Sequence, residues 1–288
     1  MRGLAEFIMR GRWQALAVAV LGAGSLLFGW ISAAAIALVT LRQGVASGGW
    51  LVFWALLPAV VASWLSGDPG SVLLLLGVFV LAVVLRATVS LALAVAASAL
   101  VGLISGGGLL LIGADFLAQL VEVFAALLEQ LQSNVATEES VALVLSAPST
   151  VQVAGILAAG NAVTAVLSLL LARYWQALLY NPGGFREEFH ALRLPPLWTT
   201  GLGLLSLAVW AQEPWVSGWA LVVSVPLMFC GFSLVHAYVA ASGRGASSLV
   251  IFYLLWLFVD PVKGLLLGCV VADAWIDFRR RWVRPPAN

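Results

Sequence analysis

The sequence is poor in charge. Only 9% of its 288 residues are charged, whereas 62% are hydrophobic. Soluble domains carry roughly 25% charged residues, because a surface in contact with water is covered largely by polar groups. A chain with this composition cannot build such a surface, so we expect it to lie in a lipid bilayer. Its apolar runs are continuous rather than alternating, which favours membrane helices over a membrane β-barrel.

Lysine, histidine and cysteine are scarce as well. Lys263 is the only lysine, and the sequence has two histidines and two cysteines. Two histidines cannot form a His-rich metal site, and cysteines within apolar runs indicate buried thiols rather than disulfides. No phosphate-binding loop, HExxH motif or GxSxG motif occurs, so the sequence predicts no enzyme, no metal and no cofactor. A net charge of +1 gives no indication of nucleic-acid binding.

Long apolar runs determine the expected fold. A membrane-spanning helix needs about 20 apolar residues. We therefore expect an all-α, polytopic transmembrane helical bundle of about 8 to 10 membrane-crossing or re-entrant helices, forming one integral membrane domain over residues 1–288. The first run is too long for one span and short for two, which suggests a short or re-entrant helix near Gly29. The runs are Trp13–Thr40, Trp50–Leu65, Ser71–Ile104 (a pair turning beside Arg86), Val151–Ala172, Leu197–Ala211, Val216–Ala240 and Ser247–Ile276 (a hairpin at Asp260-Pro261).

The distribution of arginine predicts the orientation. Cytoplasmic loops of membrane proteins carry an excess of Lys and Arg. The stretch from Ser105 to Thr150 contains five acids and no base, so we place it outside the cytoplasm. Both termini are then cytoplasmic, in the cytoplasmic (inner) membrane of a bacterium, and only Lys263 falls on the unexpected side. The basic positions assigned to the cytoplasm include Arg2, Arg10, Arg12, Arg42, Arg86, Arg173, Arg186, Arg193, Arg244 and Arg279–Arg281.

An acidic amphipathic segment lies at 106–148. Within it, Asp115, Glu122 and Glu129 share one face of a helix and Leu120 and Leu127 lie on another. Interfacial helices usually carry Lys or Arg on the polar face, so the acids do not suit an anionic lipid surface. We expect this helix to pack on the bundle; a lid over a site is the alternative.

A cytoplasmic loop at 173–196 could dock a partner. We expect a short helix, a turn at Asn-Pro-Gly-Gly and a second short helix with Phe185, Phe189 and Leu192 on one face. Aromatic side chains such as Trp175 and Tyr180 suit the depth of the lipid headgroups. The candidate docking positions are Tyr180, Asn181, Pro182, Gly183, Gly184, Phe185, Glu188 and Phe189.

Four ionisable residues in or beside apolar runs are candidate ligand-binding residues: Arg86, His236, Asp260 and Lys263. Ionisable groups within a membrane are costly to bury and are therefore candidates for function. Each has a structural alternative. Arg86 can extend its guanidinium to the membrane surface, a neutral His236 can hydrogen-bond to a neighbouring helix, and Asp260 with Lys263 can form an ion pair at a plain turn.

The order of features resembles a known family. A span ending in Arg-Tyr-Trp-Gln is followed by Asn181-Pro-Gly-Gly-Phe185-Arg-Glu-Glu-Phe189 and then Leu-Arg-Leu-Pro. This pattern resembles the YybS-like family of uncharacterised bacterial membrane proteins, which is loosely grouped with the S components of energy-coupling-factor transporters. The resemblance implies a small molecule bound between helices near the outer face, and a separate ATPase and coupling protein as partners. No vitamin-binding motif of those transporters is found, so no site residue carries over.

Two functions follow from these patterns. The first is a transporter-like protein that binds a small solute in a polar-lined cavity at membrane depth. The alternative is a non-transporting membrane scaffold that docks a cytoplasmic partner through residues 180–193. The scaffold predicts a bundle without a cavity and an exposed apolar patch on that loop, so the two differ in what the structure should contain.

Overall fold

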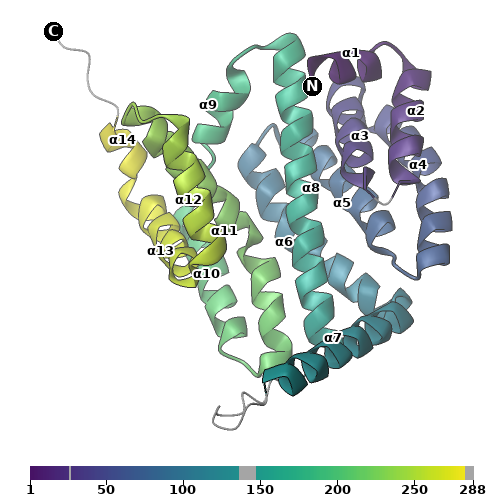
Figure 1. Cartoon of the computed structure of the whole chain (residues 1–288). Coiled ribbons are helices and arrows are strands. Elements are labelled where there is room, and N and C mark those ends of the chain that lie inside the picture. The colour runs from purple at the N-terminus through teal and green to yellow at the C-terminus, as the bar shows by residue number, and fades with distance from the viewer. Residues whose placement is uncertain (26, 136–146, 283–288) are drawn as a thin grey trace.

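The described part of the chain is helical and contains no strand. The computed structural model describes residues 1–25, 27–135 and 147–282, which form a bundle with short helices at its ends (Figure 1). The helices are α1 Arg2–Met9, α2 Arg12–Ala23, α3 Gly29–Gln43, α4 Val45–Ser66, α5 Gly70–Thr88, α6 Leu91–Ile112, α7 Ala114–Val135, α8 Thr150–Tyr180, α9 Gly184–His190, α10 Pro196–Trp210, α11 Pro214–Ala241, α12 Ala246–Phe258, α13 Asp260–Ile276 and α14 Phe278–Trp282.

Five helices of the described chain are long and apolar enough to cross a membrane: α4, α5, α6, α8 and α11. The bent pair α12–α13, with an angle of 114° at its break, adds a sixth if it is counted as one span. The all-helical class predicted from the sequence is confirmed. By length and composition the described residues thus contain five or six candidate spans, and the predicted total of 8 to 10 crossing or re-entrant helices is not confirmed, since α2, α3 and α10 have only 12, 15 and 15 residues.

The two ends of the bundle carry different charges. Helices α1, α9 and α14 lie at one end, and α7 lies across the opposite end (Figure 1). The first end, here called the arginine face, holds Arg42 against the ring of Tyr180 and Arg173 paired with Glu188 at 2.7 Å. At the other end, here called the acidic face, the described part of α7 and the turns before α5 and α11 contain acids and no Lys or Arg.

Helices α2 and α3 form a hairpin that stays short of a full membrane crossing. The hairpin begins beside Arg12 and ends beside Gln43, and these two residues line one surface pocket near the arginine face. A helix rises about 1.5 Å per residue, so α2 and α3 are roughly 18 and 22 Å long, against a hydrocarbon core of about 30 Å. The short helix expected near Gly29 corresponds to α3, which begins at that residue.

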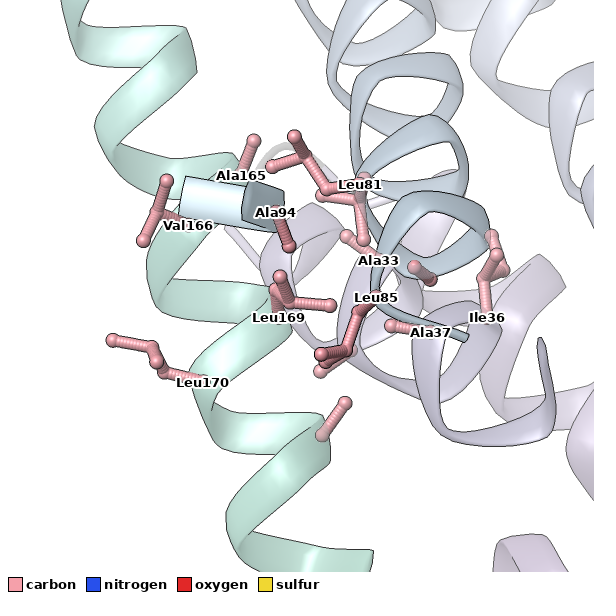
Figure 2. Close-up of a cluster of buried hydrophobic side chains, with 14 of the residues drawn as sticks. Ala33, Ile36, Ala37, Leu81, Leu85, Ala94, Ala165, Val166, Leu169 and Leu170 are labelled. Atoms are coloured by element: carbon pink, nitrogen blue, oxygen red, sulfur yellow. The ribbon is translucent and has the colours of Figure 1, made fainter. Parts of the chain in front are cut away.

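Small side chains let the neighbouring helices close around α3. Ten consecutive residues of α3, Ser32–Leu41, are buried, and the helix contacts α2, α4, α5 and α8. In the core, Leu81 and Leu85 of α5 and Leu169 of α8 lie beside Ala33 and Ala37 of α3 (Figure 2). Alanine has little volume, so the helix backbones approach closely without a driving force from water. Helix α3 is therefore the centre of the N-terminal part of the bundle.

Two helix boundaries differ from the sequence prediction. Helix α8 continues eight residues beyond Ala172 to Tyr180, so the first part of the 173–196 loop belongs to this helix. The reason is that Trp175 and Ala177 are buried against the core, which extends the apolar face past Arg173. Helix α6 likewise runs to Ile112, into the segment 106–148, where the surface helix α7 begins at Ala114. Residues 136–146 of that segment lie outside the described residues.

Candidate functional site

A cavity lies beyond the tip of the α2–α3 hairpin. Its volume is about 560 Å³, within the range of roughly 300–1,000 Å³ that is typical of small-molecule sites. We call it the hairpin-tip cavity. Its lining comes from the hairpin turn, the turn between α4 and α5, and helices α6, α7 and α8: Ala23, Ser25, Leu27, Gly29, Trp30, Ala62, Ser66, Asp68, Gly70, Ser71, Leu74, Leu109, Phe116, Ile156, Leu157, Gly160, Asn161 and Thr164.

The short hairpin explains why a cavity exists there. Helices α4, α5, α6 and α8 continue past the hairpin, because each has 19 to 31 residues and neither hairpin helix exceeds 15. Two buried hydroxyls fix the hairpin: Ser32 donates to the Ala19 carbonyl of α2 at 2.7 Å, and Ser168 of α8 donates to the Trp30 carbonyl at 3.3 Å. The space beyond the tip is therefore left unfilled by the hairpin, and Asp68 and Phe116 from the acidic face line it.

Asn161 is the central polar side chain of this cavity. It lies on α8, and its amide nitrogen donates to the Gly70 carbonyl at 3.1 Å and to the Ser105 hydroxyl at 2.9 Å. A carbonyl can only accept, so the contact with Gly70 fixes which end of the amide is nitrogen. The amide thereby ties α8 to α5 and α6. Sequence reasoning missed Asn161, although an asparagine within the apolar run 151–172 was a visible signal.

Arg86 lies at the opposite end of the bundle from the hairpin-tip cavity. The turn that the sequence places beside it follows Thr88, and the Arg86 side chain is exposed at the end of α5. Its Nη1 donates to the Leu41 carbonyl at 2.6 Å, so the guanidinium satisfies the open carbonyls at the end of α3. Arg86 also lines a small surface pocket of about 290 Å³ together with Arg173 and Glu188.

His236 belongs to a polar and aromatic cluster near the arginine face. Its Nε2 lies 2.9 Å from the Tyr253 hydroxyl, and its ring packs edge-on against Phe189 and 6.4 Å from His190. The structure thus shows His236 bonded to a neighbouring helix, with no contact to the hairpin-tip cavity. Of the four sequence candidates, none lines that cavity.

The sequence reasoning also missed a buried ion pair beside this cluster. Asp273 of α13 is only 2% exposed, and Arg279 of α14 pairs with it at 3.2 Å. Arg279 Nη1 also donates to the Ser233 hydroxyl at 3.1 Å and to the His190 carbonyl. These bonds connect α9, α11, α13 and α14. Burial lowers the pKa of Arg279, whereas the adjacent Asp273 carboxylate opposes that shift.

Asp260 and Lys263 lie at the break between α12 and α13. Their side chains pair at 2.6 Å, with 89% and 43% of each side chain exposed. Both line a largely apolar groove of about 780 Å³ between α10, α11 and α13. The break falls at Val259, directly before the Asp260-Pro261 pair where the sequence predicts it.

The candidate docking loop packs on the bundle. Phe185 and Phe189 stack on each other at 5.9 Å and pack against the hydrophobic core, and Glu188 is held by Arg173. Tyr180 is covered on one face by Arg42, 3.7 Å from its ring centre. The turn Asn181-Pro182-Gly183-Gly184 reverses the chain at a left-handed Gly183 with φ +94°. Phe185 and Phe189 therefore pack partly against the bundle and do not form an exposed aromatic patch.

Within residues 1–25, 27–135 and 147–282, no group of three or more His, Cys, Asp or Glu side chains could hold a metal ion. Comparison of this chain with protein-family models, with curated proteins and with solved structures gave no match. The geometry of the hairpin-tip cavity is therefore the basis for an assignment.

Proposed function

We propose that this protein is a multi-pass protein of the bacterial cytoplasmic membrane that binds a small solute in the hairpin-tip cavity. In this proposal the arginine face and both termini are cytoplasmic, in agreement with the excess of arginine there. The cavity then opens toward the extracytoplasmic side. The sequence predicts 8 to 10 crossing or re-entrant helices. This number is reached if the re-entrant or partial crossings α2, α3, α10, α12 and α13 are counted with the five candidate spans.

One observation carries the proposal: a hairpin too short to span the membrane leaves a cavity with a half-buried amide, that of Asn161, at its wall. Irregular backbone at membrane depth is tolerated where it is covered by protein or lines a cavity, and interrupted helices form substrate sites in many transporters. The hairpin turn and Asn161 give this cavity both features. A cavity near the outer face is also what the resemblance to transporter S components implies, and Phe116 shows that α7 contributes to its wall.

The scaffold alternative finds less support. It predicts a bundle without a cavity and an exposed apolar patch on residues 180–193. The bundle has the hairpin-tip cavity, and Phe185 and Phe189 pack against the core. We therefore propose solute binding, and no enzymatic step, as the function of the described fold.

Native mass spectrometry of protein released from mild detergent tests this proposal. The cavity can be filled by Gly160→Phe, because a Cβ at Gly160 meets no atom within 4 Å and the residue lines the cavity. Gly201→Phe is the matched control, since Gly201 on α10 is equally open and lies outside the cavity. We expect a co-released small molecule of defined mass in the wild type and in Gly201→Phe, and none in Gly160→Phe. Release of lipid only, or equal retention in both variants, contradicts the proposal.

A further inference from the structure

Hydrogen-bond donors in the hairpin-tip cavity are largely used by the protein itself. Both N–H groups of the Asn161 amide go to Gly70 and Ser105. The Thr164 hydroxyl donates to the Gly160 carbonyl at 2.8 Å, the Ser66 hydroxyl to Ala62 at 2.9 Å, and the Trp30 indole to Leu27 at 3.1 Å. The hydroxyls of Ser25 and Ser71 can still donate, and they accept as well. Little donor capacity is left for a ligand.

Acceptor capacity, in contrast, remains. The Asn161 amide oxygen makes no bond to another described residue, and the amide orientation directs it away from the Gly70 carbonyl. Asp68 uses only Oδ1, which accepts from the Gly70 backbone N–H at 2.7 Å and leaves Oδ2 open. A ligand that satisfies these groups has to present N–H or O–H donors, because acceptors facing acceptors lose the free energy of hydration without gaining a bond.

The charges around the cavity have one sign. Asp68 is the only charged residue among the described lining residues, and none of them is Lys, Arg or His. The neighbouring charges on the acidic face, Asp115, Glu122, Glu129 and Glu213, are also negative. A concave site bordered by one sign of charge raises the local concentration of ligands of the opposite sign. An anionic solute would meet repulsion here and no basic partner.

Aromatic side chains complete the site. Trp30 at the hairpin tip and Phe116 at the start of α7 both line the cavity, beside the apolar Leu74 and Leu157. The faces of aromatic rings attract ammonium groups, and the apolar wall suits a hydrocarbon body. We propose that the hairpin-tip cavity binds a small organic cation, an ammonium-bearing solute with an apolar or aromatic body. This inference rests on the proposed function.

Three probes of nearly equal shape test the ligand class: benzylammonium, benzyl alcohol and benzoate. Each is titrated by calorimetry into the full chain in nanodiscs of phosphatidylcholine, whose net charge is zero, so that net lipid charge is removed as a cause of selectivity. We expect benzylammonium to bind at least about tenfold more tightly than benzoate, because the Asp68 carboxylate and the rings of Trp30 and Phe116 attract a cation. Gly160→Phe should abolish this binding, and Gly201→Phe should not.

The contribution of Asp68 is tested by Asp68→Asn, which keeps an oxygen for the Gly70 N–H and removes the charge. It should weaken benzylammonium about fivefold or more and leave benzyl alcohol unchanged, whereas Glu213→Gln, outside the cavity on the same face, should weaken benzylammonium much less than Asp68→Asn. Equal or tighter binding of benzoate, binding that persists in Gly160→Phe, or no benzylammonium binding at millimolar concentration overturns the ligand class. Retention of a cavity-dependent solute in the mass-spectrometric test is a separate result, so solute binding can hold when the cationic class fails.

Discussion

Asn161 on α8 and Gly70 at the start of α5 are joined by a hydrogen bond of 3.1 Å between the side-chain amide and the backbone carbonyl, across 91 positions of the sequence. The bond crosses the bundle beyond the hairpin tip, where the short helices α2 and α3 no longer separate their neighbours. It therefore sets the spacing of two walls of the hairpin-tip cavity, and the amide oxygen makes no bond to another described residue.

Replacing Asn161 should affect both stability and solute retention. Asn161→Leu removes two hydrogen bonds, so we expect the free energy of unfolding in detergent to fall by about 1–3 kcal/mol. Asn161→Asp should be at least as damaging, because a carboxylate oxygen then faces the Gly70 carbonyl. Thermal unfolding and native mass spectrometry measure the two effects. Thr164→Val is the control for the stability measurement, since the Thr164 hydroxyl bonds only within α8. A similar loss of unfolding free energy in both variants would contradict a special role for Asn161.

Arg279 should be required for the stability of the fold as long as Asp273 is ionised. The Asp273 side chain is 2% exposed and that of Arg279 is 15% exposed, so Arg279→Met leaves a buried carboxylate without its cation. Removing one partner of a buried pair typically costs about 3–5 kcal/mol. The double variant Arg279→Met/Asp273→Asn should recover much of this loss in chemical unfolding, because no unpaired charge remains. A single variant as stable as the exposed control Arg280→Met would contradict the ion pair.

His190 should make stability depend on pH. Burial lowers the pKa of His190 below its usual 6.5, and the charges of Arg186, His236 and Arg279 lower it further. The unfolded chain therefore takes up a proton at a higher pH than the folded chain, so the folded state loses stability as pH falls from about 6.5 toward the lowered pKa. We expect the drop in unfolding temperature between pH 7 and pH 5.5 to be smaller in His190→Gln. An unchanged pH profile would show that His190 does not contribute.

Labelling of single cysteines should report opposite sides of the membrane for the two faces. Gln212 in the turn before α11 and Arg244 in the turn after it are both exposed, and α11 separates them. In a chain with Cys230 and Cys269 replaced by alanine, an impermeant maleimide added to intact cells should label Gln212→Cys and spare Arg244→Cys. After lysis it should label both. The reverse pattern in intact cells would place the arginine face outside and contradict the orientation in our proposal.

Much of the fold could be predicted from the sequence because hydropathy and breaks are local properties. The turns at Gly67-Asp68, beside Arg86 and at Asp260-Pro261 lie where glycine, proline and charge interrupt apolar runs. The continuation of α8 to Tyr180 was not predicted, because the burial of Trp175 depends on helices distant in sequence. The length of the α2–α3 hairpin was not predicted, because an apolar run such as Trp13–Thr40 can form either one long helix or two short ones.

The candidate site was harder to predict for the same reason. Charge singled out Arg86, His236, Asp260 and Lys263, yet none of these lines the hairpin-tip cavity. The cavity depends on neutral groups, above all Asn161 and the backbone of the hairpin turn, whose importance arises only when α5, α6 and α8 are brought together. The Arg279–Asp273 pair was not predicted, because the burial of Asp273 cannot be seen from local spacing.

The most direct test of the account is the density inside the hairpin-tip cavity in a cryo-electron microscopy map of the protein in nanodiscs, purified without added ligand and compared with Gly160→Phe. We predict a compact non-protein density between Trp30, Asn161 and Asp68 in the wild type, absent in the variant. An empty cavity, a cavity closed by a hairpin that spans the full membrane, or an acyl chain continuous with the surrounding lipid would contradict solute binding at this site.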